Sequence, residues 1–255
     1  MIDDSHWKRV ADLIEPGNRI LVITGAGMSA DSGLPTYRGV SGLYNVTDTE
    51  DGIPIERALS GPMFQRRPQL TWKYIHQLER SCRGAEPNLG HTTLAQWERH
   101  GIHMCVLTQN VDGLHERAGS KGVIPIHGTL RNILCTACKA TRVVEDYEGL
   151  SPLPLCEHCN GVLRPRVVLF GETLPQEETS ALYRETSLGF DLVMSIGTTS
   201  VFPYIAAPMR YAREWGALAI EVNPGNTEVS PYADLRFPLR SVPFFERLNK
   251  DVVLN

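Results

Sequence analysis

The chain has 255 residues, of which 42% are hydrophobic and 21% charged, and its formal net charge is −4. This length and composition predict a globular enzyme with a sizeable core, built as one large domain or as a large domain with a small one. The slightly acidic balance gives no reason to expect a nucleic-acid partner. The first residues lack the apolar core of a secretion signal, and no run of 18 apolar residues occurs, so we expect a cytoplasmic protein without a membrane partner.

Strand-like and helix-like stretches alternate along the chain, which predicts an α/β fold with a parallel sheet. Residues 40–60 interrupt the alternation. They are rich in Gly, Asp, Thr and Pro, and so long a connection indicates a functional loop that orders on binding. Helices are expected over 4–15, 62–81 and 89–100. Strands are expected over 20–24, 102–108, 122–126, 165–170, 191–196 and 217–222.

A glycine turn follows the first strand. Gly25-Ala26-Gly27, with Ala30, forms a G-x-G-x-x-A pattern, the small-residue form of the dinucleotide-binding fingerprint. We expect the glycines to leave backbone amides open to an anion, and a helix starting near Ser29 to direct its positive end at a pyrophosphate. By itself the pattern also fits an ordinary strand–turn–helix corner. No acidic residue follows a second strand to hold a ribose; instead, polar and turn-forming residues come next: Ser32, Gly33, Pro35, Tyr37 and Arg38.

Glycine or polar motifs follow six of the expected strands, at the point where each strand ends. Ligands of open parallel sheets bind at the carboxyl ends of the strands. Turn chemistry can explain any one of these motifs, but six together predict a ligand site along this edge of the sheet. They are Gly25-Ala26-Gly27, Gln109-Asn110-Val111-Asp112, His127-Gly128, Gly171-Glu172, Gly197-Thr198-Thr199 and Asn223-Pro224-Gly225.

His127 has the most suggestive setting among the eight histidines, because it follows an apolar strand and precedes a glycine. A neutral imidazole near pH 7 can serve as general base toward a ribose hydroxyl. A partly buried histidine with a structural role is the alternative. The neighbouring sheet-end motifs favour the catalytic interpretation.

Four of the six cysteines form two C-x-x-C pairs, Cys135 with Cys138 and Cys156 with Cys159, separated by 17 residues. Each pair can place two thiolates on one tetrahedral ion, so the set predicts a zinc site. Four sulfur ligands leave no open coordination position, which favours a structural ion over a catalytic one. Cys82 and Cys105 are expected in the core.

These motifs resemble, in order and over nearly the whole chain, those of the sirtuin family in its bacterial-type form. Residues 25–39 (GAGMSADSGLPTYRG) and 108–115 (TQNVDGLH) are similar to two family signatures. Ile126-His127-Gly128 is similar to the family's HG motif, and the paired cysteines to its zinc module. The stretch RPRVVLFGE over 164–172 and the two late sheet-end motifs continue the resemblance. The resemblance implies an NAD-dependent protein-lysine deacylase, a transferase that acts on acyl-lysine proteins.

The resemblance also implies a role for each motif. His127 would be the base, and Asn110 and Asp112, with Gln109 and Val111, would form the pocket that separates nicotinamide from the ribose. Ser32 and Tyr37 would border that ribose. The cofactor phosphates would be held by Gly25, Ala26, Gly27 and Arg38, and the adenosine end by Gly197, Thr198, Thr199, Asn223, Pro224 and Gly225. Val168, Phe170 and Gly171 would contact the acyl-lysine peptide, which would add as a strand between two loops.

The resemblance further implies the products: free lysine, nicotinamide and O-acyl-ADP-ribose. Two alternatives stay open, an NAD-dependent protein ADP-ribosyltransferase and a non-catalytic NAD-sensing module. The chain departs from the family at Thr36, where Asp is common, and at Pro203, since a proline one position later is commoner. The adenine-contacting residue within 238–241 cannot be placed by motif.

Acyl preference is expected from one helix. In the sirtuins that remove succinyl and malonyl groups, a Tyr and an Arg three residues apart bind the acyl carboxylate, and alignment on Trp72 and Pro87-Asn88 puts Ile75 and Leu78 there. Both side chains are apolar, so neutral acyl groups, acetyl above all, are expected. A shift in register would bring Tyr74 or Arg80 to these positions instead.

The predicted fold is therefore an α/β, Rossmann-like parallel sheet with a small inserted zinc-binding domain. The large NAD-binding domain would comprise residues 1–39, 100–129 and 165–255. Residues 40–99 would form the cofactor loop and the helical part of the small domain, and residues 130–164 the zinc module. The oligomeric state is not predicted.

Overall fold

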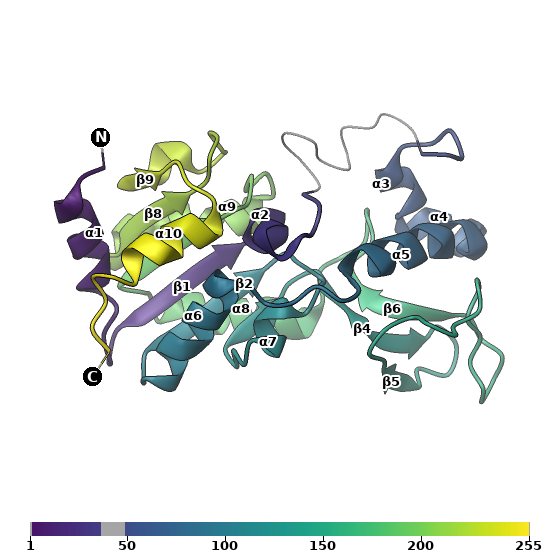
Figure 1. The fold of residues 1–255 in the computed structure, drawn as a ribbon. Coiled ribbons are helices and arrows are strands. Elements are labelled where there is room, and N and C mark those ends of the chain that lie inside the picture. Colours follow the sequence, from purple (N-terminus) through teal and green to yellow (C-terminus); the bar gives the residue numbers. More distant parts are fainter. Residues whose placement is uncertain (1, 37–48, 255) are drawn as a thin grey trace.

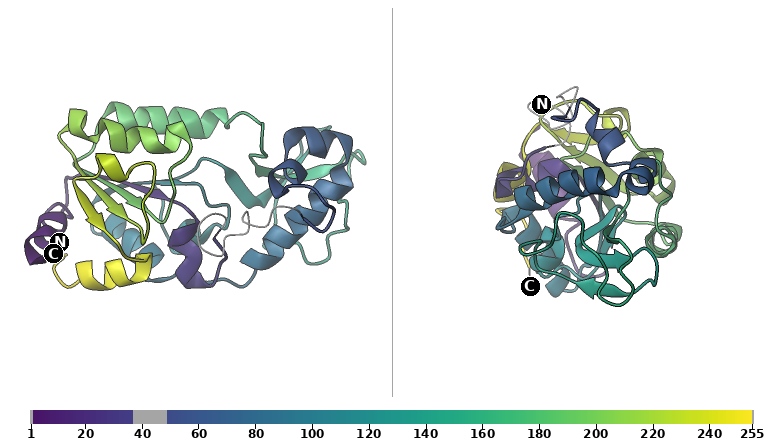
Figure 2. Two further views of the ribbon diagram at one scale, coloured as in Figure 1. Left: turned by 90° about the horizontal axis from the view of Figure 1, so that it is seen from above. Right: turned by 90° about the vertical axis from the view of Figure 1, so that its right-hand side faces the viewer.

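The structure is a computed structural model that describes residues 2–36 and 49–254. Two parts lie end to end, a large one around a six-stranded parallel sheet and a small one around a three-stranded antiparallel sheet (Figures 1 and 2). The predicted fold class is confirmed. None of the helices in the described ranges is long and apolar enough to cross a membrane.

The large sheet has the strand order β3-β2-β1-β7-β8-β9, and every neighbouring pair is parallel. From β1 the chain builds outward to one edge of the sheet, then returns to β7 and builds to the other edge. The order therefore reverses between β1 and β7, which is the switch point of a Rossmann sheet. The strands are β1 (Arg19–Thr24), β2 (His103–Thr108), β3 (Val123–Pro125), β7 (Leu192–Ile196), β8 (Leu218–Val222) and β9 (Leu235–Phe237).

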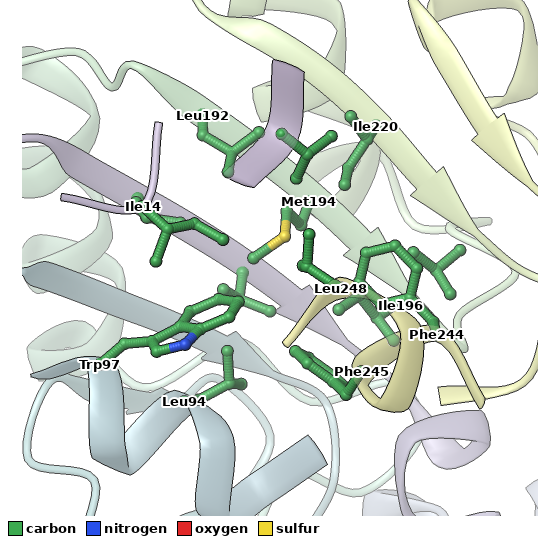
Figure 3. Packing of buried hydrophobic residues seen from close by; sticks show 14 of the residues in the cluster. Ile14, Leu94, Trp97, Leu192, Met194, Ile196, Ile220, Phe244, Phe245 and Leu248 are labelled. Carbon is green, nitrogen blue, oxygen red and sulfur yellow. The ribbon is translucent and has the colours of Figure 1, made fainter. Parts of the chain in front are cut away.

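Both faces of this sheet are covered, which explains why its strands are continuous apolar runs. Along β1, Ile20 and Val22 point to one face, and Leu21 and Ile23 to the other. The first face packs against α1 (Asp4–Ala11), α6 (Leu89–Arg99) and α10 (Ser241–Leu248), through the aromatic and aliphatic cluster in Figure 3. The second face packs against α8 (Gln176–Ser187), α9 (Pro203–Tyr211) and the 3₁₀ turn η3 (Ala212–Trp215).

The small part combines β4 (Gly128–Cys135), β5 (Thr141–Val143) and β6 (Leu163–Val167) with helix α5 (Pro68–Cys82). Trp72 of α5 is fully buried against this sheet, and its indole Nε1 donates to the carbonyl of Leu163 at 2.8 Å. The remaining short elements are α2 (Ala26–Ser29), η1 (Ala30–Ser32), α3 (Ile55–Ala58), α4 (Gly61–Arg66), α7 (Leu114–Arg117) and η4 (Ser230–Tyr232).

Three expectations from the sequence were wrong. The strand expected at 165–170 is β6, which lies in the small sheet and runs antiparallel to β4. Between β4 and β6 the chain forms β5 and contains no crossover helix of the kind that usually joins parallel strands. The helix expected over 62–81 breaks between α4 and α5 because Pro68 disfavours helical geometry at Arg67, whose φ is −142°. Finally, α6 was assigned to the small part, yet its Leu94 and Trp97 pack on the large sheet.

The start of α6 buries an imidazole pair. Asn88 caps the helix, and its backbone N–H donates to Nδ1 of His91 at 3.2 Å. The His91 ring lies 4.7 Å from that of His115, and both side chains are fully buried. Within the described part of the chain, Nε2 of His91 and Nδ1 of His115 have no hydrogen-bond partner. Burial lowers the pKa of His91 to about 4 and that of His115 well below its ordinary value.

We therefore expect acid to destabilise the protein through this pair. The unfolded chain binds protons at the ordinary histidine pKa of 6.5, whereas folded His91 binds them only near 4, so stability falls as the pH drops from 6.5 toward 4. His91 contributes at most about 1.4 kcal/mol per pH unit in that window, and His115 acts in the same direction. Urea unfolding of His91→Gln, which retains an acceptor for the cap, should show a shallower pH dependence. His100→Gln, at an exposed site, should keep the wild-type slope; equal slopes in all three proteins would contradict the assignment.

Candidate active site

A cavity of about 870 Å³ lies at the carboxyl ends of β1, β7 and β8 and extends to the small part. Its position at the switch point is the one predicted from the sheet-end motifs. Among the predicted site residues that line it are Gly25, Ala26, Gly27, Ile75, Leu78, Gln109, Asn110, Val111, His127, Val168, Phe170, Gly171, Gly197, Thr198, Thr199, Asn223, Pro224 and Gly225.

The glycine turn after β1 sits on the loop after β7. The Gly25 N–H donates to the Ile196 carbonyl at 3.2 Å, and the Gly27 N–H donates to the Gly197 carbonyl at 2.8 Å. A Cβ on Gly27 would come within 2.6 Å of the Gly197 Cα, so only glycine permits this approach. The expectation that these two amides stay open to an anion was therefore wrong. The helix also begins at Ala26 rather than near Ser29, and it has only 4 residues.

A polar network lies behind the glycine turn. The Asn110 side-chain amide donates to the Gly25 carbonyl and to Ser29 Oγ, both at 3.0 Å. Ser29 Oγ in turn donates to Asp112 at 2.8 Å. Burial raises the pKa of the Asp112 carboxyl, although the hydrogen bonds from Leu114 N–H and Ser29 oppose this shift. A small cavity of about 10 Å³ beside this network is lined by Ser29, Asn110, Val111 and Asp112, together with Cys82.

His127 lies in the connection between β3 and β4, on the cavity wall. Its Nδ1 lies 3.2 Å from the Gln109 carbonyl oxygen, and its Nε2 lies 2.7 Å from the hydroxyl of Tyr204. Burial lowers the pKa of this imidazole, while the Gln109 carbonyl opposes the shift. The ring is therefore neutral near pH 7, which is the state that a general base requires.

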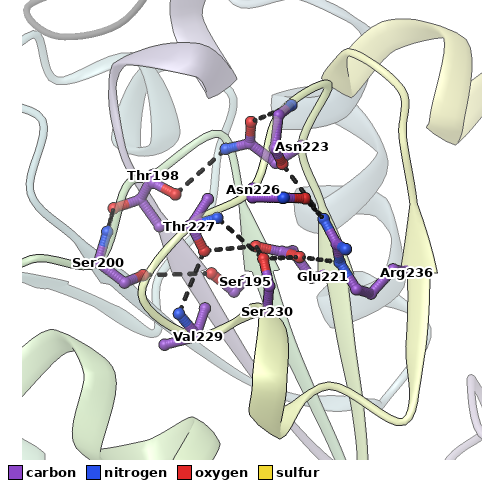
Figure 4. A network of polar contacts seen from close by, with 11 residues as sticks. Ser195, Thr198, Ser200, Glu221, Asn223, Asn226, Thr227, Val229, Ser230 and Arg236 are labelled. Atoms are coloured by element: carbon purple, nitrogen blue, oxygen red, sulfur yellow. Dashed lines mark hydrogen bonds and ion pairs between the residues drawn. The ribbon is translucent and has the colours of Figure 1, made fainter.

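The loops that follow β7 and β8 form another wall of the cavity. The Gln109 side-chain amide donates to Thr198 Oγ1 at 2.7 Å, and that of Asn223 donates to the Thr198 carbonyl at 3.2 Å. Figure 4 shows the polar contacts that Glu221 of β8 makes with the loop after this strand and with Arg236. This buried carboxylate accepts from Ser230 at 2.8 Å, from Arg236 at 2.6 Å and from the hydroxyl of Thr227.

The segment in which an adenine contact was expected but could not be placed also reaches the cavity. Leu239, Arg240 and Ser241 line it. Asp31 fixes this segment, because its carboxylate pairs with Arg240 at 2.6 Å and accepts from the Val242 N–H at 3.1 Å. Motif analysis could not show what holds this segment in place, because Asp31 lies more than 200 positions before it in the sequence.

Apolar side chains form the wall toward the small part. Ile75 and Leu78 of α5 face the cavity with Leu59, whereas Tyr74 bonds to Asp51 and Arg80 is exposed. The loop after β6 forms the opposite lip, and Arg164 holds it through two hydrogen bonds of 2.7 and 2.9 Å to Glu172. The Phe170 N–H donates to the Leu59 carbonyl at 2.9 Å, which ties the two walls together.

The outcome for Ser32, Tyr37 and Arg38 differs from that of the lining residues. Ser32 accepts a hydrogen bond from Asn88 at 3.1 Å and is absent from the lining of the large cavity as far as the chain is described. Tyr37 and Arg38 lie outside the described residues, as does most of the loop expected over 40–60. The lining also includes residues that sequence reasoning did not place in the site, among them Leu59, Phe202 and Tyr204.

The four paired cysteines gather at one end of the small sheet. Their sulfur atoms all lie within 4.8 Å of one another, with Cys135 and Cys159 3.5 Å apart and Cys138 and Cys156 3.7 Å apart. Tetrahedral zinc at about 2.3 Å from each sulfur requires sulfur separations of about 3.8 Å, so the set fits this ion. The Cys138 N–H donates to Sγ of Cys135 at 3.4 Å and lowers the pKa of that thiol to about 6, which favours the thiolate.

Comparison with known proteins agrees with the resemblance. Residues 25–203 match the Sir2 family. "NAD-dependent protein deacylase 2" of Pseudomonas aeruginosa is 49% identical over 245 residues, covering 94% of this chain and 95% of that protein. Its namesake in Pseudomonas syringae pv. tomato is 50% identical, covering 91% and 95%. A solved Sir2 homologue in complex with NAD has a TM-score of 0.84 at 35% identity, covering 98% of this chain and 93% of the other. The chain belongs to the Sir2 family.

Loss of one zinc ligand should unfold the small part. Replacing Cys156 by Ser removes one of the four sulfur ligands, so the ion is expected to leave and the two cysteine loops to lose the link between them. Elemental analysis should find one zinc per chain in the wild type and much less in Cys156→Ser, with a lower melting temperature. Cys82→Ser, at a half-buried thiol outside the cluster, should retain the zinc. A wild-type protein that is purified without zinc would contradict this site.

Proposed function

We propose that this protein removes acyl groups, acetyl above all, from protein lysines in an NAD-dependent reaction. The observation that carries this proposal is one cavity that combines the glycine turn at the switch point, a neutral imidazole and an apolar lip. Relatives of about 50% identity are named NAD-dependent protein deacylases. A solved Sir2 complex of 31% identity and TM-score 0.84 contains a deacetylated peptide and 3′-O-acetyl ADP-ribose.

The residues present fit NAD. The cavity volume of about 870 Å³ is adequate for a dinucleotide. Ala26, Gly27 and Arg240 line the cavity and would bind the phosphates. The loops after β7 and β8 lie beside them and would bind the adenosine end. When bound, NAD supplies an activated ribose that accepts the acyl group from lysine, with nicotinamide and O-acyl-ADP-ribose as products.

The chain's own groups would divide this work among three places. His127 would take a proton from a ribose hydroxyl at Nε2, because its Nδ1 proton is held by the Gln109 carbonyl. The network of Ser29, Asn110 and Asp112 would bind the nicotinamide end. Leu59, Ile75 and Leu78 would exclude water from the acyl group, and exclusion of water prevents simple hydrolysis of the cofactor.

The large cavity also supports the neutral-acyl preference. Ile75 is 1% exposed and, with Leu78, presents only apolar atoms at the position where acidic-acyl enzymes carry a Tyr and an Arg. An acyl carboxylate would be buried there without a partner. A methylene-containing acyl chain would instead gain about 0.8 kcal/mol for each buried CH₂.

Two other functions use the same features, and one incubation separates them. An ADP-ribosyltransferase would label protein, and a non-catalytic NAD sensor would give no turnover. The protein incubated with acyl-lysine peptide and NAD should release free lysine peptide and nicotinamide. A cytoplasmic location and the absence of nucleic-acid and membrane partners stay predictions.

His127→Ala should retain the fold and NAD binding but lose deacylation. Loss of a general base typically costs about 10²–10⁴-fold in rate. Turnover of an acetyl-lysine peptide and calorimetric NAD binding measure the two effects separately. His100→Ala, at the exposed end of α6, serves as the control. Near-wild-type turnover of His127→Ala would exclude this residue as the base.

Matched acetyl- and succinyl-lysine peptides test the acyl preference. We expect kcat/KM for acetyl to exceed that for succinyl by at least about 100-fold, because an unpaired buried carboxylate costs about 3 kcal/mol or more. Leu78→Arg should narrow the ratio by supplying a cation, whereas Arg80→Ala should leave it unchanged, since Arg80 is exposed. A higher efficiency for succinyl in the wild type would overturn the assignment.

A further inference from the structure

The catalytic imidazole makes a side-chain contact that the site motifs do not include. Tyr204, the second residue of α9, places its hydroxyl 2.7 Å from His127 Nε2. Its ring stacks on Phe202 at 5.5 Å between centroids, and the His127 ring meets both rings edge-on. Pro203 is the first residue of this helix, and Tyr204 follows it directly.

The two contacts of the imidazole define its tautomer. The Gln109 carbonyl can only accept, so His127 Nδ1 must carry the proton at the 3.2 Å contact. In the neutral ring Nε2 then carries the lone pair, and the Tyr204 hydroxyl must donate to it. Burial raises the pKa of Tyr204 to about 12, so the phenol keeps its proton at any pH at which the enzyme works.

We propose that Tyr204 is a positioning residue for His127: its hydroxyl holds the imidazole as the Nδ1–H tautomer with Nε2 directed into the cavity. A substrate hydroxyl that donates to His127 Nε2 must displace the Tyr204 hydroxyl from this nitrogen. A hydrogen bond donated to Nε2 stabilises the unprotonated imidazole, so Tyr204 also keeps the base ready at lower pH. The catalytic part of this inference rests on the proposed function.

Other ionisable groups around His127 are engaged elsewhere. After β2, Asp112 accepts from Ser29. After β6, Glu172 is paired with Arg164, and on β6 itself Arg166 is exposed. On α9, Arg210 lies over the ring of Tyr232. Within the described part of the chain, Tyr204 is therefore the titratable side chain that bonds directly to the imidazole.

The test compares Tyr204→Phe, which keeps the ring and removes only the hydroxyl, with the wild type. Histidine NMR on the zinc-loaded protein without NAD or peptide gives both the tautomer and the pKa of His127, and His127→Ala assigns its signal among the eight histidines. In Tyr204→Phe we expect the pKa of His127 to rise by about 0.5–1 pH unit and the Nδ1–H tautomer to lose its dominance. Tyr183→Phe, on the exposed face of α8, should match the wild type in both measurements.

The kinetic counterpart is the pH profile of kcat/KM for an acetyl-lysine peptide. Its acidic limb should move to higher pH in Tyr204→Phe by the same amount as the pKa measured by NMR. A residue that merely packs would leave both unchanged in Tyr204→Phe and would matter only in Tyr204→Ala, and that result would overturn the proposal. If the NMR shift occurs in a protein without deacylase activity, the positioning role stands and the proposed function fails.

Discussion

The site depends on one backbone contact, where the turn after β1 touches the loop after β7. A Cβ on Gly197 would lie 2.4 Å from the carbonyl carbon of Gly27, and one on Gly25 would lie 2.7 Å from the Thr198 Cβ. Without these glycines the turn after β1 could not lie against the loop after β7. The side chains of Asn110 and Gln109 bind to the two halves of this contact, so the loop after β2 takes its position from it.

The sequence predicted correctly where the site lies, but it did not predict why the turn after β1 contains glycines. Continuous apolar runs gave the buried parallel strands, since covered faces allow no polar alternation. The G-x-G pattern was interpreted as an opening for an anion, but the Gly25 and Gly27 amides are used within the fold. A pattern reports that a Cβ is excluded at a position and does not report whether a ligand or another loop excludes it. A similar limit applies to the strand expected at 165–170, because its apolar run begins at Val167, where β6 ends, and β6 itself alternates between buried and less buried residues.

Residues that position others were harder to find than residues that line the cavity. Glu221 sits 1% exposed in an apolar strand, and a charged residue in that setting was a visible signal that the sequence reasoning passed over. Its carboxylate organises the loop after β8 through three partners within 15 positions. Tyr204 and Ser29 gave no comparable signal, because their partners come from distant loops, 77 and 83 positions away. Such roles follow from tertiary contacts rather than from local pattern.

The cysteine cluster and His127 are linked through the paired strands β4 and β6. His127 occupies the last position before β4, and its carbonyl accepts from the Val168 N–H at 2.9 Å. Gly128 has a φ of +76°, and a Cβ there would lie 1.7 Å from the Arg166 carbonyl oxygen, so β4 and β6 must stay closely paired beside the imidazole. The same two strands carry Cys135 at their other end. A zinc ion held by the four cysteines would fix one end of this strand pair, and His127 lies next to the other end. Gln109 and Tyr204 contact the imidazole from the large part.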